Sequence, residues 1–173
     1  VSKEFSDLWN SNWKNSFYHE IWSKIDHRLK DFSSHTHSWD SNSTLVNWFE
    51  RRMASIELDV LSSLSLGLSL EELLLVYEIQ FPVLQQNDDD TWYDQKGNIV
   101  FTCSKGLIGI GVDRSIWNSI KDLKDGKTHE HTIEKSELYY GEKVTYYAPF
   151  EKCDRVEDYK VAWAHFEKIF NQN

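Results

Sequence analysis

The sequence predicts an α+β fold with a helical N-terminal part (a long helix plus a helical hairpin), a small antiparallel β middle and a closing C-terminal amphipathic helix. Apolar residues recur every three or four positions through residues 44–80 and 154–170, which is the spacing of one helix face. Between them, residues 91–102 and 143–150 are rich in aromatic and β-branched residues bounded by turn signals, which is typical of strands.

Residues 1–40 are polar with interspersed aromatic side chains, and we predict that they form a helical N-terminal extension. Here an apolar residue recurs at every fourth position: Phe17, Ile21, Ile25 and Leu29. This stripe predicts a helix that ends near Asp31. The following SSHTHSWDSNS is a linker by composition, so residues 41–173 are predicted to form an α+β C-terminal accessory domain.

The strongest helical pattern begins near residue 43. Its apolar stripe consists of Leu45, Phe49, Met53, Ile56, Val60 and Leu64. Gly67 predicts its C-terminal end, and a Ser-x-x-Glu capping box at residues 69–72 predicts a second helix over 70–80. Pro82 stops that helix or begins an extended stretch. The short connection predicts a helical hairpin or an angled pair.

The β middle begins with TWYD and NIVFT, which are joined by a turn at residues 94–97 and predict a hairpin. Residues 115–123 predict a short helix, 128–134 an edge strand and 143–150 a further strand. An Asp-x-x-Glu cap at 154–157 opens the last helix. The aromatic face of this helix consists of Val156, Tyr159, Trp163, Phe166 and Phe170.

Composition limits the functional classes. The 173 residues carry a net charge of −9, from 28 acidic and 19 basic residues. This argues against a self-sufficient nucleic-acid binder, because neutralising phosphates needs clustered Lys and Arg. Cys103 and Cys153 lack the spacing of a zinc site and indicate free thiols.

The sequence predicts a cytoplasmic protein with no membrane partner. No apolar stretch reaches the roughly 20 residues that a membrane-spanning helix needs. The chain starts at Val1 rather than at a methionine, so we expect either a removed leader or tag or a piece of a longer polypeptide.

Several motifs resemble sites of chemistry, and each has a simpler interpretation. Asp88–Asp90 could hold a hard cation but lack calcium-loop spacing, which favours a solvated loop. The glycine series at 105–111 is not a phosphate-loop pattern and favours a loop in which the backbone can approach a neighbour closely. The His-x-His pairs at 35–37 and 129–131 could bind a metal, but neither has an obvious third ligand. Cys103 has no neighbouring histidine to activate it.

We therefore predict no catalytic, cofactor-binding or metal-binding residue in this chain. The best-placed candidates for nucleic-acid contact are Arg51, Arg52, Lys105 and Arg114. Contacts of this kind go to the phosphate backbone. The alternative for the arginines is solvation or ion pairing at the surface.

Three segments together carry a resemblance to a known family. They are RRMASIELDVLSSLSLGLSLEELLLVYEIQFPVLQQ, TWYDQKGNIVFTCSKGLIGIGV and YYAPFEKCDRVEDYKVAWAHFEK. In this order they resemble the C-terminal region of large bacterial DNA methyltransferases of fused restriction–modification and phage-defence type. The resemblance covers roughly residues 44–170.

The resemblance implies a noncatalytic accessory domain. In such adenine methyltransferase-type proteins, the core lies upstream and carries a glycine-rich S-adenosylmethionine motif and an Asn/Asp-Pro-Pro-Tyr/Phe motif. Neither occurs here, and the only prolines are Pro82 and Pro149. S-adenosylmethionine is therefore expected only for a parent enzyme. The expected partners are the upstream methyltransferase region or other defence subunits, with weak DNA contact at most.

Two other functions remain open from the sequence. A protein–protein interaction or assembly module predicts an exposed apolar patch that includes tryptophans. A small standalone hydrolase or nuclease requires a cleft that joins Asp88–Asp90 with His129 or His131.

Overall fold

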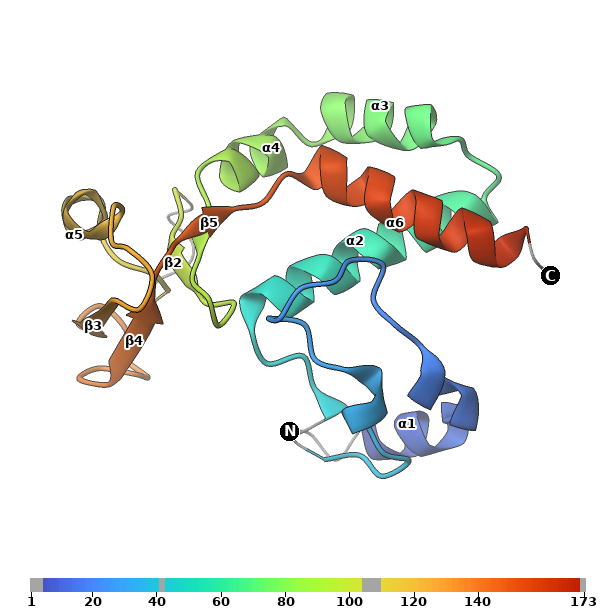
Figure 1. The fold of residues 1–173 in the computed structure, drawn as a ribbon, viewed down its shortest axis with the longest axis horizontal. Helices are drawn as coiled ribbons and strands as arrows, with labels where there is room; N and C mark the ends of the chain where they lie inside the picture. Colours follow the sequence, from blue (N-terminus) through green and yellow to red (C-terminus); the bar gives the residue numbers. More distant parts are fainter. Residues whose placement is uncertain (1–4, 41–42, 104–109, 172–173) are drawn as a thin grey trace.

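The computed structural model describes residues 5–40, 43–103 and 110–171, and it has the predicted α+β architecture. Figure 1 shows three long helices lying roughly along one another, with two small sheets at one end and the N-terminal part beneath. The long helices are α2 (Trp48–Ser65), α3 (Leu70–Gln80) and α6 (Arg155–Phe170).

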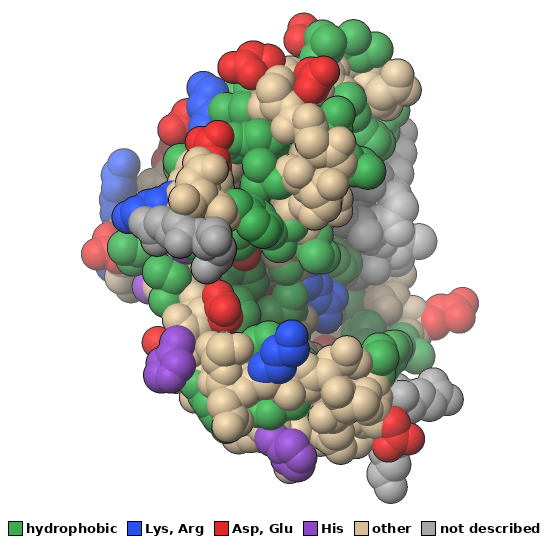
Figure 2. Space-filling view, turned by 90° about the vertical axis from the view of Figure 1, so that its right-hand side faces the viewer, with side chains coloured by type: hydrophobic (Ala, Val, Ile, Leu, Met, Phe, Trp, Pro, Cys, Tyr) green, Lys and Arg blue, Asp and Glu red, His purple; other side chains and the backbone are tan. Residues whose placement is uncertain are grey.

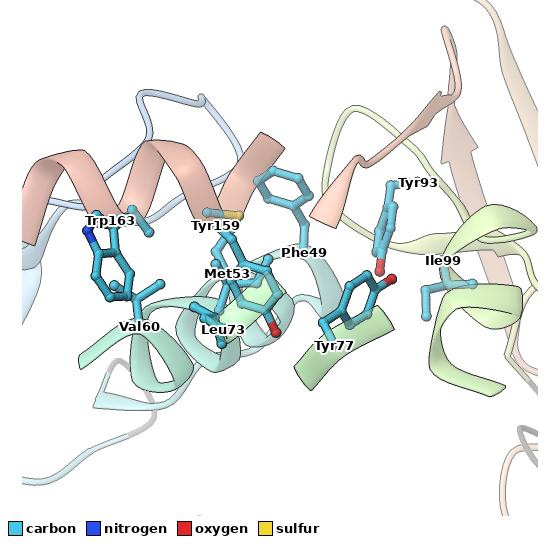
Figure 3. Packing of buried hydrophobic residues seen from close by; sticks show 11 residues of the cluster. Phe49, Met53, Val60, Leu73, Tyr77, Tyr93, Ile99, Tyr159 and Trp163 are labelled. Atoms are coloured by element: carbon cyan, nitrogen blue, oxygen red, sulfur yellow. The ribbon is translucent and has the colours of Figure 1, made fainter. Parts of the chain in front are cut away.

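The main core forms where α2, α3 and α6 meet, as Figure 3 shows. The buried residues from these helices are Phe49, Met53, Ile56, Val60, Leu73, Tyr77, Tyr159, Ala162 and Trp163. The apolar stripes predicted for α2 and α6 are therefore confirmed as core faces except at their ends, because Leu45 lies before the start of α2 and Phe170 is exposed. Their 3–4 spacing places each set on one side of its helix.

The helix ends follow local capping chemistry. The Asn47 side chain accepts from the Glu50 amide at 2.7 Å, so α2 starts at Trp48, a few residues later than predicted. Gly67 has a φ of +75°, and the Leu68 amide donates to the Ser63 carbonyl, which closes the C-terminus of α2. The capping box predicted ahead of α3 is present.

A short helix that the sequence did not predict follows α3. Helix α4 (Pro82–Asp89) begins at Pro82, which fits the first helical position because no N–H is needed there. The Gln85 side chain donates to the carbonyls of Tyr77 and Glu78 at the end of α3. The interpretation of Asp88–Asp90 as a loop was wrong, because α4 runs to Asp89. Asp88 and Asp90 have the ion-pair partners described below, whereas Asp89 is exposed, as a solvated acid is.

The β middle consists of two small antiparallel sheets. Strands β1 (Trp92–Tyr93), β2 (Ile99–Phe101) and β5 (Glu151–Lys152) form one sheet in the order β2-β1-β5. Strands β3 (Thr128–Thr132) and β4 (Lys143–Tyr147) form the other. The predicted hairpin is confirmed, and the strand predicted over 143–150 is confirmed as β4 but ends at Tyr147. Strand β5, which the sequence did not predict, follows at Glu151–Lys152 in the other sheet.

A second, smaller core lies under these sheets. Helix α5 (Arg114–Ile120) supplies Trp117, which stacks on Phe101 with ring planes 11° apart. The other buried members are Val100, Val112, Ile120, Tyr146, Ala148 and Phe150.

The helix predicted to end near Asp31 does not form. The N-terminal part contains α1 (Ser6–Asn12) and two 3-10 turns, η2 (Asn15–His19) and η3 (Phe32–Ser34). Residues 20–31, which we call the strap, contain no helix or strand and run along α2 (Figure 1).

The strap is held by carboxylates of the long helices. The Ser23 amide donates to Glu57 at 2.7 Å and the Lys30 amide donates to Glu50 at 2.8 Å. Because these amides find acceptors outside the strap, helical hydrogen bonds are not needed to satisfy them.

Candidate protein-interaction surface

Helix α3 is apolar around most of its circumference. Its inner side contributes Leu73 and Tyr77 to the core, while its outer side leaves Leu75, Val76 and Ile79 exposed by 52%, 42% and 61%. A helix that is hydrophobic all round is ordinarily covered on both sides. The outer side of α3 is therefore a candidate interface.

The exposed apolar surface continues into the junction with α4, where Phe81 and Val83 are 48% and 68% exposed. We call the side chains of Leu75, Val76, Ile79, Phe81 and Val83 the α3 face. Figure 1 places α3 and α4 along the edge of the molecule opposite the N-terminal part. Figure 2 shows hydrophobic and acidic side chains next to one another at that upper edge.

The predicted nucleic-acid contacts have different surroundings. Arg52 is buried, and its Nη1 donates to Asp158 at 2.5 Å. Arg51 is exposed, lies over the Trp48 ring and donates to the Leu45 carbonyl. Because Arg52 is buried and Arg51 is exposed, the two arginines cannot contribute to one phosphate-binding surface.

The other two predicted contacts belong to the β middle. Arg114, at the start of α5, lies over the Phe101 ring and pairs with Asp90 at 3.3 Å. Lys105 lies outside the described residues, as does most of the glycine series.

Buried ion pairs connect the long helices to one another and to the strap. Asp158 of α6 pairs with Arg52 of α2 and with Lys24 of the strap at 2.7 Å. Burial opposes the charge of Arg52, but Cys153 and Asp158 outweigh it, so the pKa of Arg52 lies above its ordinary value. These charges hold helices together and are not available to a ligand.

A second pair joins α6 to α4. The Arg155 Nε lies 2.6 Å from Asp88 Oδ2, which also accepts from the Tyr77 hydroxyl at 3.2 Å. Burial works against the charge of Arg155, but Asp88 outweighs it and holds the pKa of Arg155 above its ordinary value. Asp88 and Asp90 thus pair with different arginines, and the sequence did not reveal these partners because they are distant in the chain.

The second His-x-His pair lines a groove of about 820 Å³ between β3, α5 and the end of β2. His129 and His131 share one face of β3, and burial together with His131 lowers the pKa of His129. The Cys103 thiol lies at the edge of the groove and donates to the Asn87 side chain of α4 at 3.4 Å, not to a histidine. Among the described residues, no three His, Cys, Asp or Glu side chains form a group that could hold a metal ion.

The N-terminal tryptophans form a cluster of their own. The Trp9 ring contacts those of Trp13 and Trp39 in tilted arrangements, with ring centroids 5.5 and 5.4 Å away. An open hollow of about 480 Å³ adjoins them and is lined almost wholly by apolar atoms. This hollow is lined by Trp9, Trp13 and Trp39 together with the exposed Phe5 and Leu8, so it is an exposed apolar surface with tryptophans of the kind predicted for an interaction module. The α3 face is a separate exposed surface, which is aliphatic with one phenylalanine.

Comparisons with known proteins identify no family for this chain. Neither protein-family models, nor curated proteins, nor solved structures gave a match. In the part of the chain that the structure describes, no helix is both long enough and apolar enough to cross a membrane.

Proposed function

We propose that this chain is a noncatalytic assembly module that buries the α3 face against another protein. The observation that carries the proposal is the outer side of α3, where Leu75, Val76 and Ile79 face solvent on a helix whose opposite side is core. Covering side chains of this kind from half exposure contributes about 1 kcal/mol apiece. The face therefore supplies a driving force for association.

The charged groups support a structural role. Arg52, Arg155, Asp88 and Asp158 are buried or nearly so and are engaged with one another across helices. Strongly perturbed groups often mark active sites, but networks of ion pairs that hold a fold together perturb pKa values in the same way. Here Arg52 and Arg155, whose pKa values are raised, each have a carboxylate partner in a neighbouring helix, which accounts for their environment without a reaction.

The experiment compares two double variants of the isolated chain. Leu75→Ser with Ile79→Ser changes the α3 face, and Leu138→Ser with Tyr140→Ser changes exposed apolar residues of the β3–β4 loop. We expect only the first pair to lower binding of a hydrophobic fluorescent dye clearly, because the hollow at Trp9 stays intact in both variants, and we expect the free energy of unfolding to change by less than about 0.5 kcal/mol per site. A large loss of stability from the first pair, or unchanged dye binding, would show that the face is not a free interface.

A second candidate places this module in a DNA-modifying protein. The support is the resemblance of residues 44–170 to the C-terminal region of adenine methyltransferase-type restriction–modification and phage-defence proteins. The upstream methyltransferase region would then cover the α3 face, and any S-adenosylmethionine would belong to that region. A cytoplasmic location is part of this proposal, supported by the free thiols of Cys103 and Cys153.

Direct DNA contact in this candidate would use Arg51, Arg114 and Lys105. The proposal predicts weak binding that weakens steeply with salt, because the contacts are to phosphates. An anisotropy titration of duplex DNA at several salt concentrations tests it. Tight binding that survives high salt would contradict a packing role.

A further inference from the structure

The negative charge of this protein is concentrated in one part of the chain. Residues 53–95 contain nine acidic residues and no Lys, Arg or His. The other nineteen acidic residues are matched by all nineteen basic residues, so the net charge of −9 resides in this segment alone. The same segment contains most of α2, all of α3 and α4, and the whole α3 face.

Five of these nine carboxylates have partners within the molecule. Asp88 and Asp90 pair with arginines, while Glu57, Asp59 and Asp94 accept hydrogen bonds from the strap, from Tyr159 and from the hairpin turn. These five carboxylates are therefore engaged within the molecule.

Of the other four acidic residues, Glu72 accepts from the Ser69 amide in the capping box, and the remaining three lie on α3 and α4. Glu71 and Glu78 are exposed, and within the described residues their side chains make no hydrogen bond or ion pair. In a helix, residues three and four apart share a side, so Glu71 and Glu78 both flank Leu75. Asp89 adds an exposed carboxylate at the end of α4. The α3 face is thus an aliphatic ridge with acidic borders.

Building on the function proposed above, we infer that the α3 face binds an amphipathic helix of a partner protein whose apolar stripe is flanked by lysines or arginines. Aliphatic ridges on one helix pack into the grooves of another, which accounts for the apolar part. Basic borders on the partner meet Glu71 and Glu78 and fix its register, because complementary charge determines specificity and the association rate.

The charge pattern disfavours the other occupants. A second copy of this chain would bring Glu71 and Glu78 against the same acids, because α3 contains no basic residue. Like charges at an interface are repulsive. An anionic membrane surface or nucleic acid would be repelled for the same reason.

The experiment uses two synthetic helical peptides with identical leucine stripes, one flanked by lysines and the other by glutamates. Their binding to the full chain is measured by fluorescence anisotropy at low and high salt. We expect the lysine-flanked peptide to bind at least about tenfold more tightly at low salt, and the difference to shrink as salt screens the charges.

Matched variants locate the effect. Glu71→Gln with Glu78→Gln should weaken binding of the lysine-flanked peptide severalfold, whereas Glu137→Gln with Glu142→Gln, which removes two exposed acids of the β3–β4 loop, should leave it unchanged. Leu75→Ser with Ile79→Ser should abolish binding of both peptides.

The outcomes separate this inference from the proposed function. Equal affinity for the two peptides, with both lost in the Leu75→Ser and Ile79→Ser variant, would overturn the basic partner while leaving an apolar interface. If the Leu75→Ser and Ile79→Ser variant binds both peptides as tightly as the unaltered chain, the proposed function itself is overturned. A dimer that sedimentation detects in the unaltered chain but not in the Leu75→Ser and Ile79→Ser variant would identify a second copy as the occupant of the α3 face. That result would overturn the inference.

Discussion

Asp94 connects two segments of the β middle through one buried side chain. It is fully buried and accepts hydrogen bonds from the amides of Lys96, Asn98 and Tyr147 at 2.9, 2.8 and 3.2 Å. The turn that it stabilises presents the Gly97 carbonyl to the Phe49 amide at the start of α2. A single carboxylate therefore determines how the hairpin lies against both β4 and the main core.

Replacing Asp94 with alanine should strongly destabilise the protein. The amides of Lys96, Asn98 and Tyr147, which are partly buried, would lose their acceptor. A fully buried unsatisfied group costs about 1–3 kcal/mol, and partial access to water lowers the cost of each of these. We expect urea denaturation to show a loss of about 2–4 kcal/mol in the free energy of unfolding. Asp125→Ala, which removes an exposed acid in another turn, is the control, and equal midpoints for the two variants would disprove this role for Asp94.

Gly97 offers a paired test of close packing. Gly97 and Gly126 both have positive φ, at +81° and +74°, so alanine at either position costs about 1–2 kcal/mol in backbone energy. Only at Gly97 would a Cβ meet a neighbour, 2.5 Å from Asn47 Oδ1. Gly97→Ala should therefore lower the thermal midpoint clearly more than Gly126→Ala, and equal shifts would show that the turn can move away from α2.

At the scale of elements, α6 organises the molecule. Its inner face packs on α2 and α3, and Asp158 links it to α2 and to the strap. The strap also takes its hydrogen-bond acceptors from α2, at Glu50 and Glu57. The N-terminal extension, predicted to end at residue 40, is thus joined to the helical core through residues 20–31.

Asp158→Ala should destabilise this connection. The substitution leaves the Arg52 guanidinium buried without its carboxylate, and breaking a buried pair in this way costs about 3–5 kcal/mol. We expect urea denaturation to show that loss and trypsin to cleave faster after Lys24. Glu167→Gln, an exposed acid on the same helix, should change neither, and unaltered cleavage in Asp158→Ala would mean that other contacts hold the strap.

On the scale of the whole molecule, two cores are joined by a hairpin, and tyrosines are buried in both. Burial, and then neighbouring carboxylates, raise the pKa of Tyr77 and Tyr146 to about 12. Burial is also the main cause that raises the pKa of Tyr159 to about 12. Alkaline stability therefore depends on both cores together.

Stability should be lost between about pH 10 and pH 12. In the unfolded chain a tyrosine ionises near pH 10, so over this range the unfolded chain releases protons that the folded chain keeps. The contribution is intact below pH 10 and disappears as the pH rises through about 12. Tyr77→Phe should lessen the slope of unfolding free energy against pH, and an unchanged slope would contradict the assignment of Tyr77.

How much could be predicted depended on the range of the interactions. The capping box at Ser69, the C-terminal glycine of α2 and the hairpin around Gly97 each act within a few residues, and the structure confirmed all three. The helix predicted over the N-terminal stripe does not form, because the strap makes hydrogen bonds to distant residues that the sequence pattern does not reveal. Ser23 bonds a residue 34 positions away, and Lys24 one 134 positions away.

The α3 face is an intermediate case. The sequence showed that α3 is apolar and that every charged residue in the segment around it is acidic. It could not show which side of α3 would be covered by α6. The same limit applied to Arg51 and Arg52, which are adjacent in sequence yet one is exposed and the other is enclosed with Asp158.

The sequence by itself determined the fold class, the main helices, the capping box of α3, the C-terminal end of α2, the hairpin and the segregation of charge, because each depends on spacing, local hydrogen bonds or composition. Only the tertiary structure decided that the strap is not a helix, that Asp88 and Arg52 are internal ion-pair partners, and that one side of α3 remains open. Those outcomes depend on contacts between residues distant in the chain, where the burial of one group is determined by whichever element packs over it.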